Sequence, residues 1–199
     1  MPRRAVVPIA AVMLALAGCA QVEPPAALPP GTVRIAPDLT LVLPHPGELG
    51  QSLDVTQLVT AHYGERTFVF EEHLSATQDR ILLVSLDAMG RKAITVTWTA
   101  AGIDTEVAPW LPEGIRPENM LADIVLLYWP EAAVRQALAA SHGTLEASRQ
   151  SRSVGVGGKE VIHADYQPGA DGDPWSGSLR YRNLPWGYAL EVQSARVSP

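Results

Sequence analysis

Residues 117–130 read PENMLADIVLLYWP, and this stretch marks a change in the periodicity of the chain. Its apolar side chains recur at the spacing i, i+3, i+4, i+7, which is one stripe of a helix: Leu121, Ile124, Val125 and Tyr128. Pro117 suits the first helical turn, and Pro130 ends the run because it disfavours helical geometry at the preceding residue. A second short helix is predicted over residues 131–140, so the segment supplies two helices.

Strand-like alternation lies on both sides of this segment. Before it, apolar and polar residues alternate over residues 53–63, 67–71 and 94–99, and after it similar patterns occupy residues 144–150, 159–167, 176–183 and 187–196. Residues 81–84 (ILLV) are apolar on both faces and predict a central strand. Turns are expected at residues 64–65 and 88–90. The order of strands, two helices and strands predicts a mainly β, α+β fold with an antiparallel sheet and a helical insertion.

The N-terminus has the features of a bacterial lipoprotein export signal. A short basic region at residues 1–4 precedes an apolar run at residues 5–17, which is too short to span a bilayer comfortably. The lipobox LAGC follows at residues 16–19. We expect residues 1–18 to be a signal peptide and Cys19 to carry the lipid that anchors the protein. An ordinary secretory signal with an incidental cysteine is the alternative.

The proline content separates a tether from the folded domain. Five prolines lie between residues 20 and 37, where they disfavour a helix or a central strand. We therefore expect residues 19–37 to be a lipidated, semi-extended tether and residues 38–199 to form the domain. Ala20 follows the cysteine, and by resemblance to enterobacterial sorting rules this favours the outer membrane, with the domain facing the periplasm.

Composition excludes several classes of function. The chain of 199 residues is 47% hydrophobic and carries a formal net charge of −6, so it offers no electrostatic surface for nucleic acid. Its single cysteine permits neither an intramolecular disulfide nor a cysteine-based metal site. No histidine pair has the spacing of a metal site, and we expect neither a metal nor a cofactor.

Sequence motifs for catalysis are also missing. No GxSxG motif marks a nucleophilic serine, and the carboxylates are scattered, although a spatial pair of them is compatible with the sequence. Residues 155–159 (GVGGK) superficially resemble a phosphate loop but lack its spacing and its Ser/Thr, so a hairpin turn or bulge is predicted. We expect no enzymatic activity, with a hydrolase of lipid or thioester substrates as the least favoured alternative.

Several segments together resemble a bacterial lipoprotein family of undetermined function that is often encoded beside aryl-polyene biosynthesis genes. These segments are the lipobox, MLADIVLLYWP at residues 120–130, Trp175-x-Gly177 and Trp186-Gly187-Tyr188. That family is similar in turn to the LolA/LolB carriers. The resemblance implies a curved antiparallel sheet, or incomplete β-barrel, that encloses a hydrophobic cavity beneath a two-helix lid. It also implies membrane contact by the tip of an early hairpin, here Met89.

These observations predict an outer-membrane-anchored lipoprotein that binds an acyl chain or lipid-like ligand and assists delivery of lipids or lipoproteins. Its partners would be the acylated ligand, the outer membrane and, as a candidate, a periplasmic carrier protein. A structural or assembly lipoprotein that binds a protein partner is the main alternative. The candidate ligand-binding residues are Phe68, Phe70, Leu82, Val84, Ile94, Val96, Trp98, Leu121, Ile124, Val125 and Tyr128.

Overall fold

The computed structural model describes residues 28–112, 114–169 and 172–197. In this part of the chain the α-helices are α1 (Pro117–Tyr128) and α2 (Glu131–Leu138), and two short 3-10 helices are η1 (Pro46–Leu49) and η2 (Ala139–Ser141). The strands are β1 (Thr32–Ala36), β2 (Leu39–Val42), β3 (Leu53–Tyr63), β4 (Arg66–Ala76), β5 (Arg80–Asp87), β6 (Lys92–Thr99), β7 (Gly102–Val107), β8 (Thr144–Ala147), β9 (Ser151–Val156), β10 (Lys159–Pro168), β11 (Gly177–Asn183) and β12 (Tyr188–Arg196).

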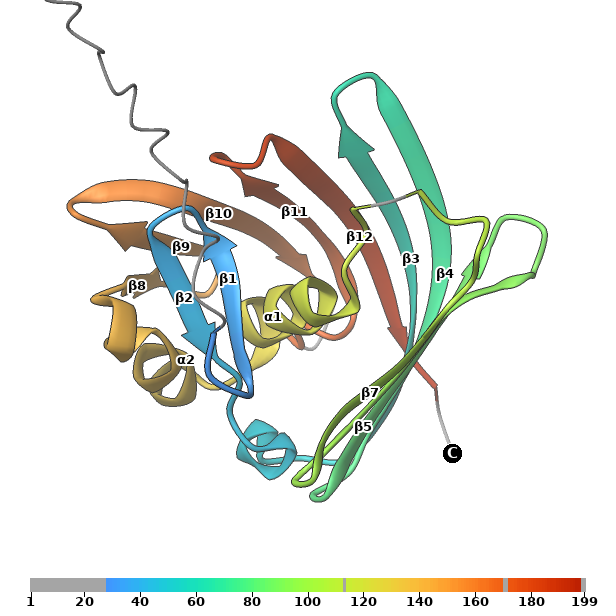
Figure 1. The fold of residues 1–199 in the computed structure, drawn as a ribbon, viewed down its shortest axis with the longest axis horizontal. Helices are drawn as coiled ribbons and strands as arrows, with labels where there is room; N and C mark the ends of the chain where they lie inside the picture. The colour runs from blue at the N-terminus through green and yellow to red at the C-terminus, as the bar shows by residue number, and fades with distance from the viewer. Residues whose placement is uncertain (1–27, 113, 170–171, 198–199) are drawn as a thin grey trace, which may run out of the picture.

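One curved, antiparallel sheet dominates the molecule (Figure 1). Its order is β7-β6-β5-β4-β3-β12-β11-β10-β9-β8, so neighbouring strands are consecutive in the chain except for β3 and β12. These two strands pair over residues 55–63 and 188–196 and join the halves of the sheet. Because β7 and β8 remain at opposite edges, the sheet is not closed. The predicted mainly β fold with an antiparallel sheet and a helical insertion is confirmed.

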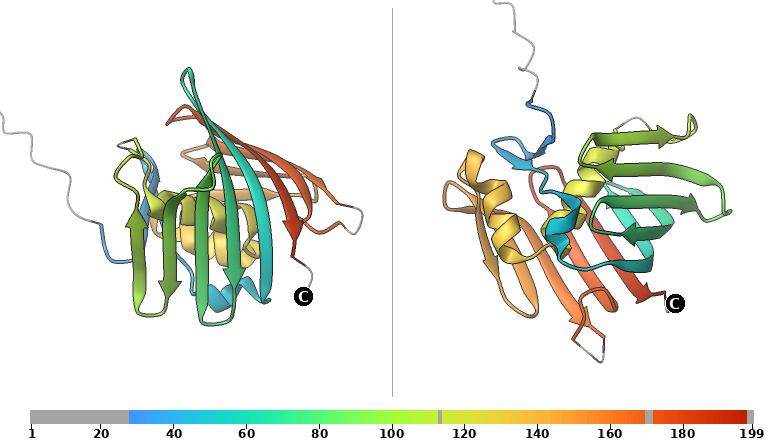
Figure 2. Two further views of the ribbon diagram at one scale, coloured as in Figure 1. Left: turned by 90° about the vertical axis from the view of Figure 1, so that its right-hand side faces the viewer. Right: turned by 90° about the horizontal axis from the view of Figure 1, so that it is seen from below.

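The two helices connect β7 to β8, and α1 lies on the concave side of the sheet (Figures 1 and 2). Pro117 occupies the first helical turn, and α1 ends at Tyr128; the next residue, Trp129, has an extended backbone (φ −69°, ψ 154°) as expected before Pro130. Both helices therefore begin and end close to where the sequence predicted. The prediction of a single apolar stripe on α1 was wrong, because every residue from Leu121 to Tyr128 is buried.

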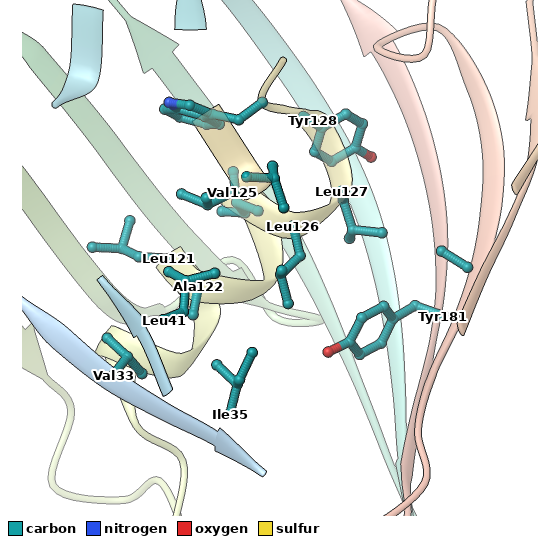
Figure 3. Close-up of a cluster of buried hydrophobic side chains, with 14 of the residues drawn as sticks. Val33, Ile35, Leu41, Leu121, Ala122, Val125, Leu126, Leu127, Tyr128 and Tyr181 are labelled. Atoms are coloured by element: carbon teal, nitrogen blue, oxygen red, sulfur yellow. The ribbon is translucent and has the colours of Figure 1, made fainter. Parts of the chain in front are cut away.

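A hairpin of β1 and β2 explains this burial. It forms its own two-stranded sheet and lies against α1 and α2 on the side away from the large sheet (Figures 1 and 3). Its apolar side chains Val33, Ile35, Leu39 and Leu41 are all buried. Side chains from distant elements fix it, since Asn183 Nδ2 donates to the Ile35 carbonyl oxygen at 2.9 Å and Ser141 Oγ donates to the Thr40 carbonyl oxygen at 2.6 Å.

The hairpin corrects the predicted boundary of the domain. Residues 32–36 lie inside the predicted tether of residues 19–37, yet they form β1 and contribute to the core. The prolines misled the interpretation because they end at Pro30 and begin again at Pro37, which leaves room for a short strand between them. The alternation of Val33 and Ile35 after Gly31 was the signal that could have revealed it.

Two strands were missed in the sheet itself. β7 is polar along most of its length and lies at an edge, where a strand needs little apolar surface. β9 (SRSVGV) has one fully buried side chain, Val154. The turn between β9 and β10 is formed by Gly157 and Gly158, which confirms that residues 155–159 form a hairpin turn.

Gly177 is required at the start of β11. Its φ is +121°, and a Cβ at this position would lie 2.7 Å from the Gly169 backbone nitrogen and 2.8 Å from the Pro168 carbonyl carbon. Both atoms belong to backbone and cannot move aside cheaply. We therefore expect Gly177→Ala to lower the free energy of unfolding by about 2–3 kcal/mol, measured by urea denaturation.

A matched control is available at Gly90, whose φ is +75° but whose Cβ would meet no atom within 4 Å. Gly90→Ala should cost only the backbone strain, about 1 kcal/mol. Equal costs for the two substitutions would contradict the predicted clash at Gly177.

Candidate functional site

Most of the predicted ligand-binding residues of the sheet share its concave face. Strand register places Phe70 opposite Val59, and Ile94 and Val96 opposite Ser85 and Leu83, on the side that faces α1. Ile94, Val96 and Trp98 are buried, whereas Phe68 at the outer end of β4 is only half-buried. The structure therefore brings together the predicted residues Phe68, Phe70, Ile94, Val96 and Trp98.

Leu82 and Val84 were assigned to the wrong face. In β5 it is Ile81 and Leu83 that are fully buried toward α1, while Leu82 and Val84 are half-buried on the convex side. Residues 81–84 are all apolar, so the alternation that reveals the inner face of the other strands is absent here. Leu82 and Val84 therefore lie outside the candidate site.

Helix α1 occupies the interior that the sequence predicted to hold a ligand. The predicted residues Leu121, Ile124, Val125 and Tyr128 are buried, and they pack in the core together with Ala122 and Leu126 (Figure 3). Trp129 stacks on Trp98 with ring centroids 5.7 Å apart, and Tyr128 stacks on Trp175 at 3.9 Å. The predicted ligand-binding side chains of sheet and helix thus belong to one hydrophobic core.

A row of polar side chains crosses the concave face and was not predicted. Ser85, Glu72, Gln57 and Ser194 are register partners on the adjacent strands β5, β4, β3 and β12, and we call them the polar row. Gln57 Nε2 donates to Ser194 Oγ at 2.7 Å and to the Tyr128 hydroxyl of α1 at 2.9 Å. Ser85 Oγ donates to Glu72 Oε1 at 3.2 Å. Here α1 meets the sheet through hydrogen bonds rather than apolar contact.

Asp123 makes a second polar contact between α1 and the sheet. Its carboxylate accepts hydrogen bonds from the Tyr181 hydroxyl at 2.5 Å and from the Tyr188 hydroxyl at 2.7 Å. Burial raises the pKa of Asp123 to about 7, although these hydrogen bonds oppose the shift. Burial likewise raises the pKa of Glu72 to about 7, against the Ser85 hydrogen bond and with a smaller contribution from Asp123.

Such a pair of buried acids is typical of functional sites, although structural networks also contain them. Sequence reasoning left a spatial pair of carboxylates open but named neither residue. The available signals were an aspartate inside the apolar run LADIVLL and a glutamate at an inward position of β4. Both are easier to see once the strand register is known.

A charged cluster on the solvent-facing side of β10 resembles a nucleophilic triad in composition. His163 Nδ1 lies 2.9 Å from Ser153 Oγ and 3.0 Å from Glu160 Oε2, and His163 Nε2 lies 3.1 Å from Asp165 Oδ1. Carboxylates on both sides of the ring favour the imidazolium, which cannot accept a proton from the serine. The cluster therefore forms an ion-pair network rather than an activated nucleophile.

This network predicts the titration of His163. Its partial burial alone would lower the pKa, but the hydrogen bonds to Glu160 and Asp165 outweigh burial and raise the pKa above the ordinary value of a histidine. The ion pairs therefore stabilise the fold at pH values below the unfolded-state pKa, and this stabilisation is lost as the pH rises through the folded-state pKa. NMR titration of the imidazole should show a higher pKa than in Asp165→Asn. An unchanged pKa in that variant would contradict the network, and the exposed Asp104→Asn serves as control.

A partly open pocket of about 470 Å³ lies at the C-terminal end of α1. Leu127, Tyr166 and Pro168 form apolar wall, and Arg149 and Arg152 contribute positive charge. Arg152 Nη1 donates to the carbonyl oxygens of Leu126 at 2.9 Å and Trp129 at 2.8 Å, and the Tyr166 hydroxyl donates to that of Leu127 at 2.7 Å. These bonds satisfy three carbonyl oxygens at the C-terminal end of α1.

Met89 and Cys19 were predicted to contact the membrane. Met89 lies at the tip of the β5–β6 hairpin with 79% of its surface exposed, near Arg91, which stacks over the exposed Trp110 at 4.5 Å. Membrane contact by Met89 stays a prediction. Cys19 and the predicted signal peptide lie outside the described residues. Among the described helices, none is long and apolar enough to cross a bilayer.

In the described part of the chain, no group of three His, Cys, Asp or Glu side chains is placed to hold a metal ion. In the cluster around His163, the two carboxylates contact opposite nitrogens of the ring.

Comparison with known proteins gives a family but no activity. The model of a family described as a protein of unknown function, DUF3261, matches residues 54–196. Among curated protein sequences, none matches the chain significantly. A solved DUF1329 family protein from Desulfovibrio piger has a TM-score of 0.38 and 8% sequence identity, over 75% of this chain and 87% of that chain.

Proposed function

Because the chain belongs to the DUF3261 family, whose function is unknown, we propose its role from its own geometry. We propose that it is a periplasm-facing lipoprotein of the outer membrane that shelters an acyl chain or similar apolar ligand on the concave face of its sheet. In this proposal α1, α2 and the β1–β2 hairpin form a removable closure. The protein would act as a binding and delivery protein without catalysis, as LolA/LolB-like carriers do.

The observation that carries the proposal is the way α1 fills an unclosed sheet. A helix that is buried on all sides occupies a concave apolar face bounded by two free edges. If α1 moved outward, an apolar ligand could cover Ile94, Val96 and Trp98 in its place. Such exchange avoids exposing these side chains to water. Exposure would be costly, because burying one CH₂ group stabilises a protein by about 0.8 kcal/mol.

The contacts of α1 with the sheet also favour such movement. Part of the contact between α1 and the sheet consists of hydrogen bonds from the polar row and from the tyrosines. If α1 moved, water could form hydrogen bonds with the same groups, so the net free-energy cost of breaking these contacts is low. The half-buried Phe68, Leu190 and Tyr188 leave some apolar surface accessible on the concave face even with α1 in place. A ligand could first contact the protein there.

Anchoring follows from the sequence. In the proposal the lipid on Cys19 holds the domain at the outer membrane, and Met89 at the hairpin tip touches the bilayer. A periplasmic carrier protein would deliver the ligand. The covalent lipid is needed because the acidic chain has no net attraction to anionic lipid surfaces.

Native mass spectrometry of the full chain, purified from membranes in a mild detergent, tests the ligand. We expect a co-purified acyl-bearing molecule that survives removal of the detergent. Phe68→Asp, on the concave face, should reduce its occupancy, whereas Val69→Asp, on the convex face of the same strand, should not. Phe68 is half-buried and Val69 is 39% exposed, so neither change should prevent folding. Wild-type protein without bound lipid, or equal occupancy in both variants, would refute the proposal.

A protein-binding or assembly role is the second candidate. It is favoured by the dense packing of the predicted ligand residues and by the free edge of β7, which is available for strand pairing. A protein that co-purifies with wild type and with Phe68→Asp alike, in the absence of lipid, would support this role over the first.

A further inference from the structure

We propose that the pocket at the C-terminal end of α1 binds a single-chain anionic amphiphile. Its carboxylate or phosphate head would lie against Arg149 and Arg152, and its apolar part against Tyr166, Pro168 and Pro174. This site is separate from the concave face invoked above, and the inference does not depend on the interior binding a ligand.

The positive side of the pocket is preorganised. Both hydrogens of Arg152 Nη1 are engaged by the carbonyl oxygens of Leu126 and Trp129, which holds the guanidinium in a fixed orientation. A guanidinium has five N–H donors, so the hydrogens on Nε and Nη2 are not used by these two bonds. A planar arginine fork matches the geometry of a carboxylate or phosphate. Arg149, on the turn between β8 and β9, adds a second positive charge to the same pocket.

Because the whole chain is acidic, the two neighbouring arginines of this pocket are informative about the charge of its ligand. With a net charge of −6 the protein repels anions in general, so an anion requires a local concentration of positive charge. The two arginines provide one, beside the end of a helix where the carbonyl oxygens of Leu126, Leu127 and Trp129 already accept hydrogen bonds from Arg152 and Tyr166. An anion placed there therefore has arginine donors close to these paired carbonyls.

The apolar part of the pocket lining selects for an apolar body. Leu127, Tyr166, Pro168 and Pro174 present carbon surface, and the Tyr166 hydroxyl is occupied by the Leu127 carbonyl. The volume of about 470 Å³ lies within the range of about 300–1,000 Å³ found for small-molecule sites. A bare anion would leave most of this space and all of the apolar wall unused.

Calorimetry on the full chain in phosphatidylcholine nanodiscs tests the inference, with empty nanodiscs as the blank. The probes are octanoate, octyl phosphate, octanol and inorganic phosphate. We expect octanoate and octyl phosphate to bind at least about tenfold more tightly than octanol or inorganic phosphate, because only they use both sides of the pocket. If octanol bound as tightly as octanoate, the arginines would have no role in binding. If inorganic phosphate bound as tightly as octyl phosphate, the pocket would be an ion site. Either result would overturn the proposal.

Arginine variants locate the binding. Arg149 lies on an exposed turn, so Arg149→Gln should not affect the fold. The substitution should weaken octanoate binding by about tenfold. Arg180→Gln, an exposed arginine on the convex face of β11, is the matched control and should bind like wild type. Unchanged affinity in Arg149→Gln, or no binding of any probe to wild type, would overturn the proposal. Lipid occupancy by mass spectrometry should be unaffected by Arg149→Gln, which separates this site from the interior one.

Discussion

Glu72→Gln is expected to raise the free energy of unfolding by about 3 kcal/mol at pH 8 and to leave it close to the wild-type value at pH 4. Glu72 is buried on the concave face, and burial raises its pKa from 4.5 to about 7. A glutamine has nearly the same shape and keeps an oxygen to accept the hydrogen bond from Ser85. It differs in having no proton to lose, so it never becomes a buried charge.

The direction of the pH dependence follows from proton binding. The native carboxyl of Glu72 holds its proton more tightly than the unfolded one, so its contribution to stability is complete below the unfolded-state value of 4.5. That contribution is lost as the pH rises through the folded-state pKa of about 7. Asp123 adds a dependence of the same sign, since burial raises its pKa from 3.8 to about 7. Wild-type stability should therefore decline from pH 4 to pH 8.

Urea denaturation at intervals between pH 4 and pH 8 measures this effect. The control is Glu71→Gln, which removes a carboxylate from the neighbouring position on the exposed side of β4 and should change stability by less than about 0.5 kcal/mol. If the free energy of unfolding of Glu72→Gln kept the full pH dependence and gained nothing at pH 8, the Glu72 carboxyl of the wild type would ionise in the folded state at little free-energy cost. The assignment of Glu72 to a desolvated site would then be wrong.

The two buried acids connect proton binding to the position of α1. Asp123 belongs to α1 itself, and Glu72 belongs to the polar row that receives Tyr128. Loss of either proton places a negative charge at the junction between helix and sheet, where burial destabilises it. The pH dependence of stability therefore reports on the contact between α1 and the sheet.

Periodicity predicted those parts of the fold in which one face is buried and the other is exposed. The strands around residues 53–63 and 94–99 have this property, and they lie where expected. Periodicity could not orient β5, whose residues Ile81–Val84 are apolar on both sides. It also could not reveal that α1 is covered on its outer side, because the covering residues come from a hairpin far away in the chain.

The candidate site was predictable only in part for the same reason. Inward positions such as Phe70 and Val96 follow from alternation within one strand. The polar row arises only when four strands take a particular register, and Asp123 meets Tyr181 and Tyr188 across the sheet–helix junction. Such contacts depend on pairing between distant segments, which a single sequence does not specify locally.

The hairpin itself provides the second large prediction. Leu41 of β2 is fully buried against the helices, whereas its neighbour Val42 is 41% exposed. We expect Leu41→Ala to lower the free energy of unfolding by about 3 kcal/mol, because it removes buried methyl groups and leaves a cavity beside α1. Val42→Ala, the matched control, should change stability by less than about 0.5 kcal/mol.

This comparison distinguishes a structural hairpin from a tether. Both substitutions shorten an aliphatic side chain at adjacent positions, so a flexible tether would respond to neither, and a hairpin packed on α1 responds only at Leu41. Urea denaturation gives the two free energies, and amide hydrogen exchange in α1 and α2 should accelerate in Leu41→Ala alone, because β1 packs against α1 and β2 packs against α2. If Leu41→Ala matched Val42→Ala in both measurements, the hairpin would not hold α1 in place. The closure would then consist of the two helices by themselves, and the sheet would need another reason to retain α1 on its concave face.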